Sequence, residues 1–251
     1  MSRYAVLIAA RMGSSRFPGK TLSEINGKPM LEILVDRLKY SKNIGKIIVA
    51  TTESEVDDAI EKWCALKNHL CYRGSKDDVL QRLLDAANYF KLNTIVEVLG
   101  DNPFIHSDLV DDTINLFSRS EYDYVATITN EYGILRPELK RFPIGIRVQV
   151  FSMATLRRCA KLAKQKQYRE HATSFIIENK NIFKMGFIEA NNQFNSCNRP
   201  ELTFAVNLRK NFELINNLYN ECIKINPNFS IQDLISVYDS NPDWHWMMGN
   251  E

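Results

Sequence analysis

The sequence predicts an α/β fold in which helices cover both faces of a mostly parallel central sheet. Apolar runs of strand length alternate with segments of helical apolar spacing through the first half of the chain. The 251 residues suffice for one such domain. We find neither a linker nor an internal repeat, and therefore expect a single domain over 1–251, with a core over 1–130 that the later part, 131–251, elaborates.

Buried strands are expected wherever a short apolar run is bounded by polar residues. Such runs cover 4–9, 46–51, 94–99 and 122–128, with later ones near 145–151, 183–188 and 202–206. Helical spacing covers 30–38, 54–66, 77–90, 107–117 and 209–223, and further helices begin at Ser152 and Arg169. The expected N-caps are Ser54, Ser107 and, for the helix near 77, either Ser75 or Asp77.

Two polar segments follow expected strands directly. The loop 10–20 follows the first strand, and Gly100-Asp101-Asn102-Pro103 follows the strand at 94–99. Parallel sheets bind ligands at the carboxyl ends of their strands, where the strand order reverses. The expected fold therefore favours a ligand site at these segments.

The loop 10–20 has the composition of an anion site. It holds Arg11, Arg16 and Lys20, and the small residues between them are Gly13, Ser14, Ser15 and Gly19. Small residues let backbone N–H groups approach phosphate oxygens, while the cations neutralise a triphosphate. The spacing is not that of a P-loop. An ordinary basic surface loop is the alternative interpretation, but the place directly after the first strand favours a nucleotide site.

Asp101 supplies a carboxylate at the end of a strand. A carboxylate that faces phosphates suits Mg²⁺. A turn aspartate that binds its own backbone ahead of Pro103 is equally consistent with the sequence. His171, in Arg169-Glu170-His171, carries little weight by itself, since a lone histidine is more often structural than catalytic.

The bulk composition excludes several classes of function. The net charge is +2 with no long basic run, so no nucleic-acid partner is expected. The five cysteines are scattered, which argues against zinc or a disulfide framework and for reduced thiols. The apolar stretch after Met1-Ser2-Arg3 is too short for a signal peptide or a membrane span. We therefore expect a cytoplasmic protein without membrane contact.

These features together resemble one family. The chain is similar to the cytidylyltransferases that activate acidic sugars, most closely to the branch of the spore-coat polysaccharide protein F, which is related to the CMP-sialate and CMP-Kdo synthetases. The specific match is Ala10-Arg11-Met12-Gly13-Ser14-Ser15-Arg16-Phe17-Pro18-Gly19-Lys20. Weaker matches follow in the family's order: Arg73-Gly74-Ser75-Lys76-Asp77-Asp78-Val79-Leu80, Gly100-Asp101-Asn102-Pro103, Phe142-Pro143-Ile144-Gly145 and Arg169-Glu170-His171.

The resemblance implies a Rossmann-like nucleotidyltransferase fold, with 1–130 binding the nucleotide and 131–251 binding the acceptor and forming a homodimer. CTP would contact Ala9, Ala10, Arg11, Gly13, Ser14, Arg16, Lys20, Arg73, Ser75 and Asp78, of which the last three frame the cytosine. The implied catalytic residues are Arg11, Lys20 and Asp101, and the implied Mg²⁺ ligands are Asp101 and Asn207. The implied acceptor-binding residues are Arg147, Gln149, Arg169, Glu170 and His171.

The chain departs from the family pattern at three acids. Family members typically read Gly-Leu-Asp-Val-Glu-Val where this chain has Gly145-Ile146-Arg147-Val148-Gln149-Val150. Asn207 stands where the family has an aspartate that commonly completes the metal site, and Arg209 and Lys210 follow it. A neutral amide binds a hard dication more weakly than a carboxylate does, and nearby cations repel the ion. Arg147 could instead engage an anionic group of the acceptor.

Two hypotheses of different class follow. The first is a CTP-dependent enzyme that transfers CMP to an acidic sugar, nonulosonic or Kdo-like, or to a related phosphorylated acceptor, with release of pyrophosphate, in surface polysaccharide or glycan biosynthesis. The alternative is a catalytically weakened homologue that keeps the nucleotide pocket and acts as a partner or regulatory subunit. The intact loop and Asp101 favour the enzyme, and the lost acids at positions 147, 149 and 207 favour the binding protein.

Overall fold

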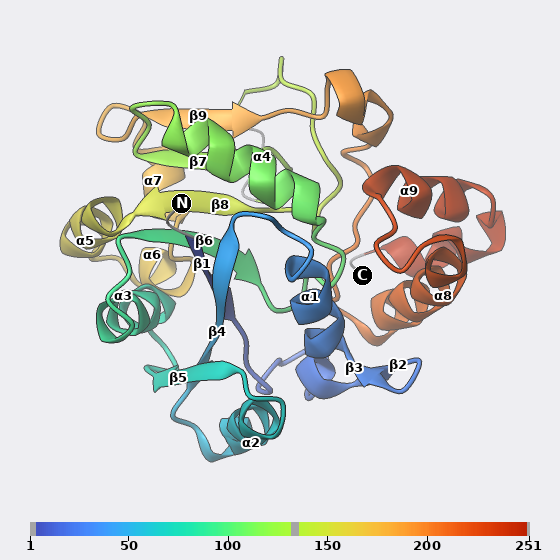
Figure 1. Ribbon diagram of the computed structural model, residues 1–251, viewed down its shortest axis with the longest axis horizontal. Coiled ribbons are helices and arrows are strands. Elements are labelled where there is room, and N and C mark those ends of the chain that lie inside the picture. Colours follow the sequence, from blue (N-terminus) through green and yellow to red (C-terminus); the bar gives the residue numbers. More distant parts are fainter. Residues whose placement is uncertain (1–3, 132–135, 250–251) are drawn as a thin grey trace.

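A computed structural model describes residues 4–131 and 136–249 of the chain, and these residues form a seven-stranded sheet between two layers of helices (Figure 1). The strands are Tyr4–Ala9 (β1), Ile44–Thr52 (β4), Leu70–Gly74 (β5), Thr94–Leu99 (β6), Tyr124–Thr127 (β7), Gln149–Ser152 (β8) and Met185–Ile188 (β9). They lie side by side in the order β5-β4-β1-β6-β8-β7-β9. β8 runs antiparallel to both of its neighbours, and the other adjacent pairs are parallel, which confirms the mostly parallel sheet.

Helices cover both faces of this sheet, as the sequence predicts. One layer contains Met30–Leu38 (α1), Asp58–Leu66 (α2), Ser107–Ser118 (α4), Arg209–Ile225 (α8) and Ile231–Asp239 (α9). The other contains Val79–Tyr89 (α3), Met153–Leu162 (α5), Lys166–Glu170 (α6) and Ser174–Glu178 (α7). The short elements are a hairpin of Glu24–Ile25 (β2) and Lys28–Pro29 (β3), and the 3-10 turns Lys20–Leu22 (η1), Glu55–Asp57 (η2), Asn192–Cys197 (η3) and Pro242–Met248 (η4). In Figure 1, α3 and α5 lie on one side of the central strands, and α1 and α8 lie on the other.

Strand β1 is buried from both sides. Val6 and Ile8 belong to the core under α1, whereas Ala5 and Leu7 belong to the core under α3. All four residues are 5% exposed or less. Because alternate residues of a strand meet opposite helix layers, the strand needs the unbroken apolar run that the sequence shows.

The strand order reverses between β1 and β6. From β1 the chain proceeds outward to β4 and β5, and then crosses back to β6 on the other side of β1. The two strand ends approach closely, since Gly100 N donates to Ala9 O at 2.9 Å. A Cβ atom at Gly100 would lie 2.9 Å from the Cβ atom of Ala10, so a larger residue would push the strand ends apart. A crevice at the carboxyl ends of strands is expected at such a reversal.

The prediction of a strand at 202–206 is wrong. Thr203 forms a single bridge with Ile144, and the described residues contain no further pairing of this segment. The segment instead crosses the end of the sheet, where Val206 N donates to Asp101 O at 2.9 Å. The apolar side chains of the segment are buried where it crosses the sheet. A segment buried in this way needs the same apolar run in the sequence as a buried strand does.

Other elements differ from their predicted bounds. The strands expected at 122–128, 145–151 and 183–188 begin later than predicted, and the strand expected at 46–51 extends further. The prediction of a helix that begins at Arg169 is wrong, because α6 ends at Glu170 and α7 begins at Ser174. Ser54 takes the N-cap position of η2 but makes no side-chain capping bond. The other predicted N-caps are wrong, because the capping side chains are His106 for α4 and Asp78 for α3, in place of Ser107 and of Ser75 or Asp77. Capping depends on how the chain enters the helix, which the residue type alone does not specify.

Candidate active site

A cleft of about 410 Å³ opens at the carboxyl ends of β1 and β6. Its walls come from the loop 10–20, from the first turn of α3, from the end of β6, from the segment 170–172 and from Asn207. The two segments that the sequence placed at strand ends therefore lie in one cleft. Four cations line it among the described residues: Arg11, Arg16, Lys20 and Arg82.

The loop 10–20 is held in a curled conformation by its own backbone. Ser14 N and Gly19 N both donate to Met12 O at 2.9 Å. Gly19 has a φ of +80°, in the left-handed region that glycine adopts without steric cost. Met12 N donates to the buried carboxylate of Asp57 at 2.6 Å, which ties the loop to the end of β4. The loop is thus fixed, and Arg11 and Arg16 remain exposed on it.

Lys20 and Asp101 form an ion pair on the floor of the cleft. Lys20 Nζ lies 2.9 Å from Asp101 Oδ2 and donates to Val206 O at 2.5 Å. Arg16 donates to Asn207 Oδ1 at 3.1 Å. The crossing segment 202–206 is what brings Asn207 to this place, so residues from three distant parts of the chain meet here.

Arg82 is a cleft residue that the sequence analysis did not identify. It lies on the inner face of α3 and is almost fully buried. Its guanidinium donates to Ser75 O at 2.7 Å, while its Nε has no partner in the described part of the chain. Burial, assisted by the charge of Arg11, lowers the pKa of Arg82 to about 10. The sequence signal was an arginine among the apolar positions of an amphipathic helix, with Leu80 and Leu83.

Glu97 is a second cleft residue that was missed. It is 2% exposed, in the middle of β6, and its Oε2 accepts from Gln149 Nε2 at 3.0 Å. Burial raises the pKa of Glu97 to about 7, against the opposing charge of Arg147. A carboxyl group in this position can hold or release a proton near neutral pH. The sequence signal was a single acid inside an otherwise apolar strand.

Arg147 and Gln149 belong to a buried polar network beneath the cleft. Arg147 donates to the hydroxyl of Tyr124 at 2.9 Å and to Gln149 Oε1 at 3.0 Å. Its Nε lies 3.8 Å from the carboxylate of Glu131. Arg147 and Gln149, which stand where the resemblance places two acids, thus bind each other. Glu97 stands directly across from Gln149 in the sheet, so an acid remains at this point on the neighbouring strand.

Some predicted site residues lie elsewhere. Among the described residues, the cleft is not lined by Gly13, Arg73, Ser75, Asp78, Arg147, Gln149 or Arg169. Arg73 forms ion pairs with Asp58 and Glu61 on α2, at 2.7 and 2.8 Å. Arg169 lies 2.7 Å from Asp78 and so ties α6 to the start of α3. Their assigned roles with cytosine and acceptor stay predictions. Glu170 and His171 do line the cleft.

The cleft offers oxygen donors of the kind that Mg²⁺ prefers. Asp101 supplies a carboxylate and Asn207 an amide oxygen. In residues 4–131 and 136–249, no group of three or more His, Cys, Asp or Glu side chains could hold a metal ion by itself. This set fits an ion that is bound partly by phosphate oxygens, since Mg²⁺ usually takes one or two carboxylates plus substrate phosphates.

Comparison with known proteins decides the family. The sequence profile described as cytidylyltransferase matches residues 5–222. The chain belongs to the cytidylyltransferase family, and it is a nucleotidyltransferase. This cytidylyltransferase is 29% identical over 250 residues to the spore coat polysaccharide biosynthesis protein SpsF of Bacillus subtilis, with 97% of each chain covered.

Two further relatives support the assignment. The cytidylyltransferase is 34% identical over 123 residues to the 8-amino-3,8-dideoxy-manno-octulosonate cytidylyltransferase of Shewanella frigidimarina. This match covers 47% of this chain and 48% of the relative. A solved cytidylyltransferase from Leptospira borgpetersenii superposes with a TM-score of 0.83 and 26% identity, over 100% of this chain and 98% of that one. Each helix in the described parts of the chain is too short or too polar to span a bilayer.

Proposed function

We propose that this cytidylyltransferase transfers CMP from CTP to an acidic sugar and releases pyrophosphate, in the synthesis of a surface polysaccharide. The observation that carries the proposal is the cleft at the reversal of strand order, whose described lining contains four cations and one aspartate, Asp101, which is paired with Lys20. The relatives named for spore coat polysaccharide and for an acidic octulosonate support the acceptor class.

The cations have a direct role in this reaction. An oxygen of the acceptor attacks the α-phosphorus of CTP, and the bond from that phosphorus to the pyrophosphate oxygen breaks on the opposite side. Negative charge accumulates on the departing pyrophosphate, and Arg11, Arg16, Lys20 and Arg82, which line the cleft, would neutralise it. Catalysis then consists mainly of positioning and of charge stabilisation by groups that are already oriented.

Asp101 and Asn207 would hold Mg²⁺ together with the triphosphate. When bound there, the ion would supply Lewis-acid stabilisation of the negative charge on the triphosphate. Asp101 is the stronger ligand, because Asn207 offers only a neutral oxygen and also accepts a hydrogen bond from Arg16. Their common place in the cleft supports this assignment.

The acceptor would enter beside the segment 170–172, opposite the loop 10–20. Glu170, His171 and Glu97 line the cleft. Arg147 and Gln149 would act from beneath, since Gln149 orients the carboxyl group of Glu97 through its amide. We further propose that the chain forms a homodimer through its later part, as the resemblance to the family implies.

The test is pyrophosphate release from each of the four nucleoside triphosphates with Mg²⁺, across a panel of acidic sugars and phosphorylated acceptors. We expect turnover with CTP and one acidic sugar. Tight CTP binding without turnover on any acceptor would instead favour the weakened homologue. Turnover with another triphosphate, or only with a non-sugar phosphate, would contradict the proposed substrates.

A further inference from the structure

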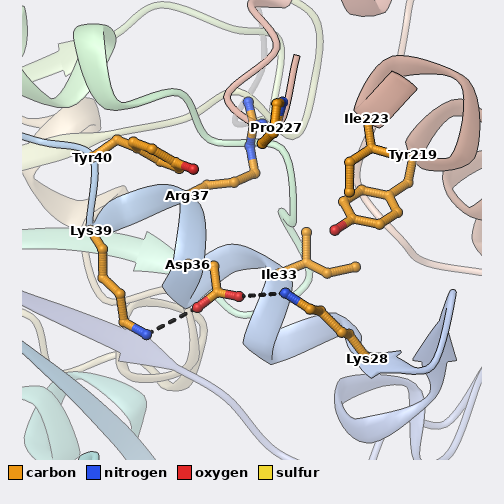
Figure 2. Close-up of a pocket in the computed structure, with 9 residues that line it drawn as sticks. All are labelled: Lys28, Ile33, Asp36, Arg37, Lys39, Tyr40, Tyr219, Ile223 and Pro227. Carbon is orange, nitrogen blue, oxygen red and sulfur yellow. Dashed lines mark hydrogen bonds and ion pairs between the residues drawn. The ribbon is translucent and has the colours of Figure 1, made fainter. Parts of the chain in front are cut away.

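A second cavity, of about 340 Å³, lies between α1 and α8. Among the described residues it shares no lining residue with the nucleotide cleft. Its walls come from β3, from α1 and the two residues after it, from α8 and from Pro227. Figure 2 shows the hydroxyl groups of Tyr40 and Tyr219 pointing into the space between the two helices.

Arg37 is the buried cation of this cavity. It is 3% exposed, and it donates to Ile105 O at 3.3 Å and to Phe229 O at 2.9 Å, with its guanidinium carbon 3.9 Å from the centre of the Phe229 ring. Its NH1 has no hydrogen-bond partner, and no carboxylate forms an ion pair with it, within residues 4–131 and 136–249. Burial lowers the pKa of Arg37 to about 10. A buried cation without a counter-ion is costly, so an anion here would relieve that cost.

The other polar groups of the cavity also provide more hydrogen-bond donors than acceptors. Asp36 is the single carboxylate in the described lining, and both of its oxygens are engaged, by Lys28 at 3.0 Å and by Lys39 at 3.0 Å (Figure 2). The hydroxyl groups of Tyr40 and Tyr219 have no hydrogen-bond partner in the part of the chain that the structure describes. The cavity thus sets three positive groups against one carboxylate, and three of its donors, Arg37 Nη1 and the two tyrosine hydroxyl groups, have no acceptor among the described residues.

We propose that this cavity is a binding site for a small anionic metabolite that carries a phosphate or a carboxylate group. The anion would accept hydrogen bonds from Tyr40, Tyr219 and Lys28, and its charge would offset that of Arg37. The apolar wall formed by Ile33, Ile223 and Pro227 would contact the carbon skeleton. The volume lies near the lower end of the usual range for ligand pockets, which suits a ligand of about monosaccharide size.

The experiment is a titration of the full chain with inorganic phosphate, glucose 6-phosphate and glucuronate, followed by NMR of the tyrosine rings. The described lining of the nucleotide cleft contains no tyrosine, so shifts of Tyr40 and Tyr219 report on this cavity alone. We expect at least one anion to shift both rings saturably. Preference for the phosphates or for glucuronate then identifies the anionic group, and either preference supports the site.

The test variant combines Lys28→Gln with Tyr219→Phe, and its anion binding is followed through the ring signals of Tyr40. The matched control is Lys67→Gln. Lys67 is also a lysine paired with an acid of α1, Glu32, but it lies outside the described lining of the cavity. The double variant should bind at least about tenfold more weakly, which is about 1.4 kcal/mol, and Lys67→Gln should bind normally. Absence of shifts with all three anions, or equal affinity in the double variant and the wild type, would overturn the proposal.

Discussion

Asp101 lines the cleft at the end of β6, where it pairs with Lys20. Its carboxylate is 28% exposed at the end of β6, and it lies next to an ammonium group and one residue after Gly100. As the only carboxylate paired with a loop cation in the described cleft, it is the residue whose loss should separate catalysis from nucleotide binding.

Asp101→Asn should reduce turnover by about a hundredfold or more, because a neutral amide stabilises a metal and its phosphates poorly. CTP binding should persist in part, since the four cations remain. Pyrophosphate release and calorimetry with CTP measure the two effects. Asp108→Asn, on the exposed surface of α4, is the control and should leave both unchanged. Normal turnover in Asp101→Asn would remove this residue from the metal site.

Asn207→Asp should strengthen Mg²⁺ binding in the presence of CTP, by about tenfold, because it adds a second charged ligand beside Asp101. The dependence of pyrophosphate release on Mg²⁺ concentration measures this. An unchanged Mg²⁺ dependence would show that Asn207 does not contact the ion, and that its bond to Arg16 is its main role.

Glu97→Gln should change how stability depends on pH. The ordinary pKa of 4.5 rises to about 7 in the folded chain, so the folded state retains a proton that the unfolded state releases between these values. The wild type should therefore lose stability as pH rises from 4.5 to 7, by up to about 3 kcal/mol, and the Glu97→Gln variant should not. Denaturant unfolding at about pH 4.5 and about pH 8 measures this. Parallel stability curves for the two proteins would contradict the raised pKa.

At the scale of elements, the ends of β1 and β6 are in direct contact at the cleft. Gly100 and Ala9 are joined by a backbone hydrogen bond, and the loop 10–20 begins at this contact. The spacing of these two strand ends therefore sets the distance between the cations of the loop and Asp101.

Gly100→Ala should destabilise the chain by about 1–3 kcal/mol and weaken CTP binding, because its Cβ atom would lie 2.9 Å from Ala10 Cβ and 3.0 Å from Ala9 O. Thermal unfolding and calorimetry measure the two effects. Gly13→Ala is the matched control for stability alone, since a Cβ atom there meets nothing within 4 Å. Equal stability of the two variants would show that the strand ends can separate freely.

The sequence predicted the central elements well because their local pattern and their burial agree. β1 is apolar on both faces, β6 is so except for Glu97, and α1 and α8 carry regular apolar spacing. Edge strand β5 is largely half-buried and lacks such a run. The segment 202–206 shows the limit of this reasoning, because burial by a crossing chain and burial in a sheet leave the same apolar pattern.

The candidate site was predictable to the extent that its residues lie in short recognisable motifs, of which the loop 10–20 is the most specific. Arg11, Arg16 and Lys20 share a loop, and that loop lies in the cleft as expected. Arg82 and Glu97 resemble ordinary helix and strand residues until the strand order brings them to the same cleft. Such residues are identified by tertiary position, which local spacing does not contain.

At the scale of the whole molecule, β9 ends the sheet, and within the described residues it pairs with β7 alone. An edge strand leaves backbone groups without partners and is a common place for association. This edge belongs to the later part of the chain, to which the resemblance assigns dimer formation.

Sedimentation at micromolar concentration should give twice the 29.0 kDa mass of the chain. The physical reason is that pairing of two copies would cover edge surface that one copy leaves open. Mutation of Met185 to Lys, on β9, should shift the equilibrium toward the single chain, whereas Leu70→Lys, at the opposite edge on β5, should not. A single chain at all concentrations would contradict the homodimer.

The Lys20–Asp101 ion pair has a consequence for the order of events in turnover. Without nucleotide, the protein's own ammonium group occupies the carboxylate, so a free divalent ion must compete with it. Triphosphate oxygens can draw Lys20 away and release Asp101 at the same moment. We therefore expect the preformed magnesium–CTP complex to be the substrate. Surplus uncomplexed CTP would fill the same cations without bringing a metal ion to Asp101, and we expect it to act as a competitive inhibitor.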